Sequence, residues 1–104
     1  MPEASDRILY VVYKITFPNG KIYIGMDIGG SGHSLRYFGS WDNKTVSADF
    51  GRDELMDFTI RKEILFESYN KKEVAQMEGE LIKQYRSNDP TIGYNRTHRK
   101  RRNK

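Results

Sequence analysis

The stretch "VVYKITFPNGKIYIG", residues 11–25, limits the fold of this chain more than any other part of it. Two runs rich in Ile, Val and Tyr flank "PNG", a pattern typical of a β-hairpin. Each run carries a tyrosine, Tyr13 in the first and Tyr23 in the second. Because side chains alternate between the two faces of a sheet, the length of the turn decides whether these phenols share a face.

The residues of the turn favour one of two loop lengths. A two-residue Asn19-Gly20 loop would put the tyrosines on opposite faces, whereas a loop that begins at Pro18 puts them on the same face. Proline presets the backbone angle of the first turn position, and Gly20 suits the left-handed residue that completes a three-residue loop. We therefore expect Tyr13 to pair with Gly25, which leaves a dent in the sheet beside the phenols.

The rest of the chain reads as one domain of alternating strands and helices, of the α/β or α+β class. We predict strands over residues 7–17, 21–28 and 58–68, short helices over 44–50 and 53–57 with a break at Gly51, and a long helix over 71–85. The third strand alternates through Ile60, Lys62, Ile64 and Phe66, and Asn70 with Glu73 forms a capping-box pattern before the long helix.

Charge divides the chain into a body, residues 1–95, and a basic tail, residues 96–104. The tail holds six of the eighteen Lys and Arg residues and no acid, which leaves twelve basic and fourteen acidic residues in the body. Any electrostatic affinity for nucleic acid is therefore expected in the tail, through Arg96, Arg99, Lys100, Arg101 and Arg102. The alternative is a solubilising end without a partner.

Composition excludes several classes of protein. The chain has no cysteine, so it has no disulfide, no thiolate nucleophile and no cysteine-based zinc site. Two histidines, His33 and His98, make a structural metal site a poor fit. No long apolar run or signal-peptide pattern is present, so we expect a soluble cytoplasmic protein without a membrane segment.

One carboxylate lies on the apolar side of the predicted long helix. At about 100° per residue, Glu78 falls between Val74 and Ile82, whereas Lys72, Glu73, Glu80 and Lys83 face the other side. A carboxylate there needs a charged partner or a cation, so Glu78 is either half of a buried ion pair or a metal-binding or catalytic group. Gly79, in the interior of the same helix, predicts a close approach on its own side. Arg36 is the arginine that fits either role of Glu78, or it is a surface charge.

These residues resemble the GIY-YIG endonucleases, in particular the small nucleases of phages and mobile introns. "YIG" is literal at residues 23–25, and "VVY" at 11–13 stands where the family has GIY, with Val11 in place of its glycine. Glu78 before "GELIK" matches the metal-binding glutamate, and "GYN" at 93–95 matches the closing motif. "YFGS" at 37–40 is similar to the free-standing phage homing endonucleases.

The resemblance implies a three-stranded antiparallel sheet flanked by helices and a role for each matched residue. Tyr13 would be the general base or water-orienting phenol, Tyr23 would contact the water or the phosphate, and Arg36 would bind the scissile phosphate. Glu78 would hold one Mg²⁺ or Mn²⁺. The supporting residues would be Gly25, His33, Tyr37 and Asn95, where His33 or Tyr37 replaces the family's histidine unless His33 is simply solvated.

The resemblance thus predicts a metal-dependent endonuclease acting on double-stranded DNA, of phage or mobile-element origin. Three alternatives remain: a dimeric restriction-type nuclease, a catalytically silent nucleic-acid-binding module on the same fold, and a small interaction domain. The alternative for Tyr13 and Tyr23 is that both are ordinary core residues of the sheet.

Overall fold

The computed structural model of the chain describes residues 9–27, 39 and 41–96. The elements, in chain order, are β1 (Tyr10–Thr16), β2 (Ile22–Asp27), α1 (Asn43–Ala48), α2 (Arg52–Met56), β3 (Arg61–Ser68) and α3 (Lys71–Tyr85). The strands form one antiparallel sheet in the order β2-β1-β3. In its described residues the protein is therefore a small α+β domain with a three-stranded antiparallel sheet and three helices, which confirms the predicted class.

The hairpin between β1 and β2 closes through the three-residue loop. The Phe17 N–H donates to the Lys21 carbonyl at 2.9 Å, and the Gly20 N–H donates to the Phe17 carbonyl at 2.9 Å. Gly20 has a φ of +89°, in the left-handed region that glycine adopts without strain. Proline and glycine therefore set the turn as the sequence predicts.

The register of the hairpin follows from that loop. Tyr13 pairs with Gly25, and Ile15 pairs with Tyr23. Since facing alternates along a strand, both tyrosines project from the same face of the sheet. The prediction of a shared face is confirmed.

A β-bulge interrupts the pairing of β1 with β3. Val12 lies opposite Phe66, but the next residue, Tyr13, lies opposite Ile64. The extra residue of β3 reverses the facing of everything beyond it, so Ile64 packs on one side of the sheet and Phe66 on the other. The predicted alternation through Phe66 is therefore wrong beyond Ile64, whereas Lys62 stays in phase with Ile64 and shares the face of Tyr13.

Some predicted boundaries shift. β3 begins at Arg61 and not at residue 58, because its partner β1 ends opposite it at Thr16. Gly51 separates α1 from α2 as expected and is the N-cap residue of α2. The predicted strand residues 7, 8 and 28 lie outside the described residues.

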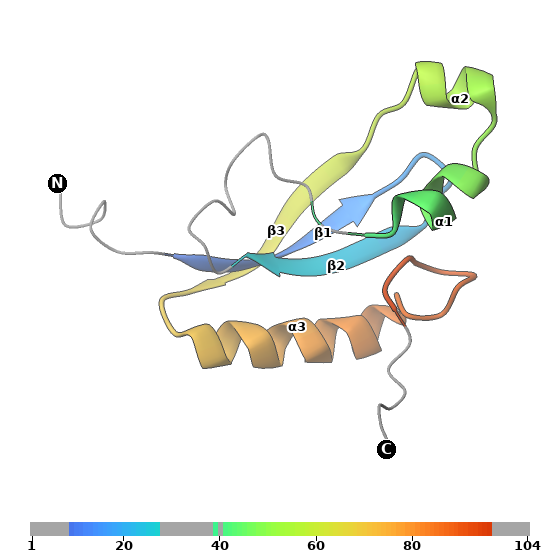
Figure 1. Ribbon diagram of the computed structural model, residues 1–104. Coiled ribbons are helices and arrows are strands. Elements are labelled where there is room, and N and C mark those ends of the chain that lie inside the picture. The colour runs from blue at the N-terminus through green and yellow to red at the C-terminus, as the bar shows by residue number, and fades with distance from the viewer. Residues whose placement is uncertain (1–8, 28–38, 40, 97–104) are drawn as a thin grey trace, which may run out of the picture.

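The sheet has a separate core on each face, and Figure 1 shows α3 along one face and α1 on the other. Val12, Ile24, Val74 and Ile82 form the buried core under α3. Val11, Tyr13, Ile15, Phe17, Val46, Phe50 and Tyr94 form the core under α1. Both tyrosines therefore belong to the face opposite α3, with Tyr23 packed against the margin of the α1 core.

α3 begins at a side-chain cap, as the sequence predicts, but the cap is only half of a capping box. The Asn70 side chain accepts from the N–H groups of Lys72 and Glu73, at 2.9 and 3.3 Å. Glu73 does not return the bond to Asn70 itself. The Ser68 hydroxyl accepts the Asn70 N–H at 2.9 Å and donates to Glu73 at 2.7 Å, so serine relays the contact. None of the described helices has the length and apolar character that a membrane span requires.

Candidate functional site

The segment that follows α3 closes the outer edge of β2. The Ile22 N–H donates to the Ile92 carbonyl at 3.1 Å, and the Tyr94 N–H donates to the Ile22 carbonyl at 2.8 Å. A Cβ on Gly93 would lie 2.5 Å from the Ser87 carbonyl oxygen and 2.6 Å from that of Ile22. A glycine is therefore needed for this segment to come so close to the strand.

Asn95 continues this contact with its side chain. Its amide accepts from the Ile24 N–H at 2.8 Å and donates to the Ile24 carbonyl at 2.8 Å. Both outward backbone groups of Ile24 are thus satisfied, which fixes the orientation of the amide. The geometry gives Asn95 a positioning role between two segments that are 71 residues apart.

A pocket of about 590 Å³ opens beside Asn95, between the two layers that cover the sheet. Its lining includes Tyr23 from β2, Glu78 and Gly79 from α3, Trp41, Asn95 and Arg96. Three residues singled out from the sequence for one site, Tyr23, Glu78 and Asn95, therefore meet here. Arg96, the first residue of the basic tail, adds a positive charge at the same place.

Glu78 lies at the margin of the α3 core and not in its middle. Val74 and Ile82 are buried on the same side of the helix, whereas the half-buried Glu78 lines the pocket at the edge of β2. The sequence gives the correct angular position of Glu78 around the helix axis. It cannot show that the sheet packed against α3 ends at this position. A carboxylate at this margin keeps contact with a polar pocket, so it is not sealed in apolar surroundings.

Gly79 does not make the close approach that the sequence predicts. A Cβ added to Gly79 would meet no atom of the described residues within 4 Å, so the prediction is wrong for that part of the chain. The residue instead lines the pocket next to Glu78. Its missing side chain therefore leaves room in the pocket wall.

Tyr13, from the central strand β1, does not line the pocket. Its side chain is 1% exposed, and a Cβ on Gly25 would lie 2.5 Å from its phenol oxygen. The dent expected at Gly25 is thus filled by the Tyr13 ring itself. A Cβ on Gly39 would lie 3.0 Å from both the Tyr13 Oη and the Tyr23 Cε2, so the two side chains converge at that residue.

The sequence reasoning missed Lys62, whose ammonium lies 5.0 Å from the centre of the Tyr13 ring. A signal for it was present. Lys62 is in phase with Ile60 and Ile64, so it is a charged residue on an apolar face, as Glu78 is on its helix. Burial lowers the pKa of Lys62, and the negative charge of Asp27 raises it in part.

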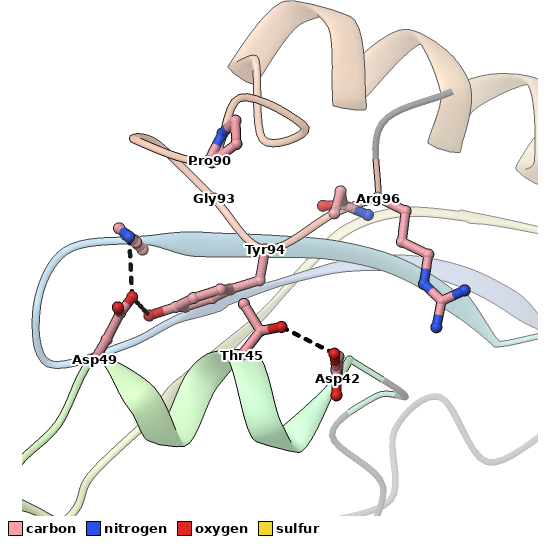
Figure 2. A pocket seen from close by; sticks show the side chains of 9 residues that line it. Asp42, Thr45, Asp49, Pro90, Gly93, Tyr94 and Arg96 are labelled. Carbon is pink, nitrogen blue, oxygen red and sulfur yellow. Dashed lines mark hydrogen bonds and ion pairs between the residues drawn. The ribbon is translucent and has the colours of Figure 1, made fainter. Parts of the chain in front are cut away.

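A second pocket, of about 560 Å³, adjoins the first and shares Asp42, Tyr94, Asn95 and Arg96 with it. Figure 2 shows the Tyr94 ring reaching from the segment after α3 to Asp49 at the end of α1. The Tyr94 hydroxyl donates to Asp49 at 2.6 Å and accepts from Asn19 at 3.0 Å, and the Lys21 ammonium binds Asp49 at 2.9 Å. These contacts join the hairpin turn, α1 and the closing segment.

The electrostatics of this network favour the protonated Tyr94 phenol and the ionised Asp49 carboxylate. Burial, and then the hydrogen bond to Asp49, raise the pKa of Tyr94 to about 12, so its phenol remains a donor at neutral pH. The bond from Tyr94, and then that from Lys21, lower the pKa of the Asp49 carboxyl. Tyr94 is therefore fixed in place and is not a candidate base.

The remaining predicted residues lie outside the described part of the chain. These are His33, Arg36 and Tyr37 near the site, and Arg99, Lys100, Arg101 and Arg102 in the tail. Within the described residues no group of three or more His, Cys, Asp and Glu side chains gathers to hold a metal. Mg²⁺ in phosphate chemistry often takes one or two carboxylates and completes its shell with water and substrate oxygens. Asp42 also lines the pocket, but its carboxylate accepts from the Lys44 N–H and the Thr45 hydroxyl. Glu78, which lines the same pocket from α3, fits that kind of site.

Comparison of the chain with protein-family models, curated proteins and solved structures gives no match. The site therefore has to be interpreted from its own geometry and from the sequence motifs.

Proposed function

We propose that the chain is a divalent-metal-dependent DNA endonuclease of the GIY-YIG type. The observation that carries this proposal is that Tyr23, Glu78 and Asn95 meet at one pocket, although they come from β2, α3 and the segment after α3. The motif residues chosen from separate parts of the sequence would not be expected to converge if each were an incidental match.

The reaction would be hydrolysis of a phosphodiester bond. Water attacks phosphorus, the bond from phosphorus to the 3′ oxygen breaks, and a tyrosine accepts the proton that the water loses. Of the two phenols, Tyr13 would be the base, and Tyr23 at the pocket wall would orient the water or the phosphate. Glu78 would hold one Mg²⁺ or Mn²⁺, which supplies Lewis-acid polarisation of the phosphoryl oxygen and stabilises the leaving oxygen.

Positive side chains would bind the DNA backbone around this centre. Arg96 lines the pocket and begins the basic tail, so it would contact a phosphate next to the cleaved one. Arg36 remains the proposed partner of the scissile phosphate. The amide of Asn95 would act indirectly, because it holds β2 and the closing segment in register.

A plasmid-nicking assay with Mg²⁺ tests the proposal. Wild-type protein should nick supercoiled DNA, and EDTA or Glu78→Gln should abolish nicking. Glu80→Gln is the matched control, because Glu80 is exposed on the same helix and does not line this pocket. Cleavage that persists in both EDTA and Glu78→Gln would refute the role of Glu78.

One observation favours a second candidate, the catalytically silent nucleic-acid-binding module. Tyr13 is buried, and it does not line the pocket that contains Glu78. A silent module would bind DNA in a salt-dependent manner and would not nick it, whether Mg²⁺ is present or absent.

A further inference from the structure

Three strands bring a small polar cluster together on the α1 face of the sheet. Tyr13 of β1 has Lys62 of β3 on one side, with the lysine ammonium 5.0 Å from the ring centre. Asp27 of β2 is close enough to act on the charge of Lys62. All three residues project from the same face, because the bulge in β3 lies beyond Lys62 and leaves its facing unchanged.

Burial makes this cluster unusual. Asp27 is buried and Lys62 is half-buried, so the charges act through protein and are screened less than surface charges. Burial lowers the pKa of Lys62, and Asp27 opposes that change and favours the charged ammonium. In the part of the chain that the structure describes, Lys62 lies at the Tyr13 ring, Tyr23 converges with it at Gly39, and Asp27 acts on Lys62. Tyr94 belongs to the same core.

We propose that Lys62 is a positioning residue that stabilises negative charge on the Tyr13 phenol oxygen and so makes Tyr13 competent as a base. This inference rests on the proposed nuclease function. A tyrosine has a reference pKa near 10, which is poor for a base at neutral pH. A positive charge within about 4–6 Å favours the ionised form of a group, and the ammonium of Lys62 is the cation that the described structure places at the ring.

The proton balance is simple. The Tyr13 phenolate accepts one proton from the attacking water and becomes a phenol, and the resulting hydroxide forms the new bond to phosphorus. The 3′ oxygen leaves with the bonding electron pair and takes a proton from solvent. Lys62 keeps its own protons throughout, because it acts only through its charge.

Titration of Tyr13 itself tests the proposal without any cleavage. The tyrosines would be labelled with ¹³C at Cζ, and the Tyr13 signal would be assigned from its absence in Tyr13→Phe. Lys62→Met and Lys62→Gln should move the titration of Tyr13 to higher pH, whereas Lys62→Arg should leave it near the wild-type position. An unchanged Tyr13 titration in both neutral variants overturns the proposal, even if the protein proves not to be a nuclease.

The pH dependence of cleavage separates this role from a structural one. Each rise of one in the pKa of Tyr13 lowers its phenolate fraction at neutral pH tenfold. Lys62→Met should therefore cut DNA about tenfold or more slowly at pH 7, with a deficit that narrows as the pH rises. A deficit of the same size at every pH would mean that Lys62 serves only packing. If the wild-type protein does not cleave DNA but the Tyr13 titration still shifts in the Lys62 variants, the proposed nuclease function is refuted. The electrostatic coupling between Lys62 and Tyr13 is then still supported.

Discussion

Tyr13 lies across Gly25, its partner in the β1–β2 ladder, and occupies the space that a side chain at residue 25 would need. A Cβ on Gly25 would lie 2.5 Å from the phenol oxygen and 2.6 Å from the adjoining ring carbon. The glycine of the "YIG" stretch is thus a steric requirement of the tyrosine in the "VVY" stretch.

Gly25→Ala should therefore destabilise the fold. The added methyl group forces the buried Tyr13 ring to move, and overpacking of this kind costs about 1–3 kcal/mol. Denaturant unfolding followed by tyrosine and tryptophan fluorescence measures the loss. A variant as stable as the wild type would show that the ring moves without cost.

Gly79→Ala should have the opposite effect. Gly79 lies inside α3, and a Cβ there would meet no described atom within 4 Å, so the gain in helix propensity should raise the free energy of unfolding by about 0.4–1 kcal/mol. The same methyl group narrows the pocket beside Glu78, so affinity for DNA, measured by fluorescence anisotropy, should fall. Lower stability would mean that the space next to Gly79 is filled.

Asn95→Ala should loosen the edge of β2. It leaves the N–H and carbonyl of Ile24 without their partner, which costs about 1–3 kcal/mol for groups that are partly buried. Amide exchange at Ile24 should quicken, while exchange in the middle of β1 should change only as global stability changes. Asn95→Asp is the control: it can accept from Ile24 but cannot donate, and it should rescue little.

Tyr94→Phe should produce a stability loss that depends on pH. The pKa of Tyr94 is raised from 10.0 to about 12 in the folded protein, so its contribution is complete below pH 10 and disappears as the pH rises through 12. The pKa of Asp49 is lowered from 3.8, so its contribution is present above that pH and is lost on further acidification. Between pH 5 and 9 the variant should be less stable by about 1 kcal/mol.

Unfolding measured from pH 3 to 12 checks this prediction, with Asp49→Asn as the companion variant. Asp49→Asn keeps the shape of the side chain and removes the charge, so in that background the stability difference caused by Tyr94→Phe should no longer depend on acid pH. If the difference in free energy of unfolding between Tyr94→Phe and the wild type is the same from pH 3 to 12, the hydroxyl contributes only through packing.

Removal of residues 96–104 should weaken DNA binding and flatten its dependence on salt. The tail holds six basic residues, and each phosphate contact contributes about 0.9 to the slope of log affinity against log salt. The slope should fall by up to about 5 if all six bind phosphates. Equal affinity and slope for the shortened chain would show that the tail is not the DNA-binding arm.

The local features of the fold could be predicted from the sequence because their causes are local. Pro18 and Gly20 set the loop length, the loop length sets the register, and the register puts both tyrosines on one face. The bounds of α3 follow in the same way from Asn70 and the helical period. These parts of the fold depend on residues that are neighbours along the chain.

The features that escaped prediction depend on contacts between distant residues. A period-two pattern cannot show where one extra residue enters a strand, so the bulge before Phe66 was missed. The helical angle of Glu78 says nothing of where the sheet above it ends. The same limit concealed Lys62, since its approach to Tyr13 needs β1 and β3 side by side.

The contact between Asn95 and Ile24 also affects how readily the protein aggregates at high concentration. The backbone N–H and C=O groups of an exposed edge strand can form hydrogen bonds with another protein molecule, and such pairing leads to aggregation. In β2, the backbone groups of Ile22 and Ile24 instead form hydrogen bonds with the segment after α3. The Asn95 amide therefore also covers part of the β2 edge, where another molecule could otherwise pair. Loss of Asn95 should reduce the solubility of the protein as well as its stability.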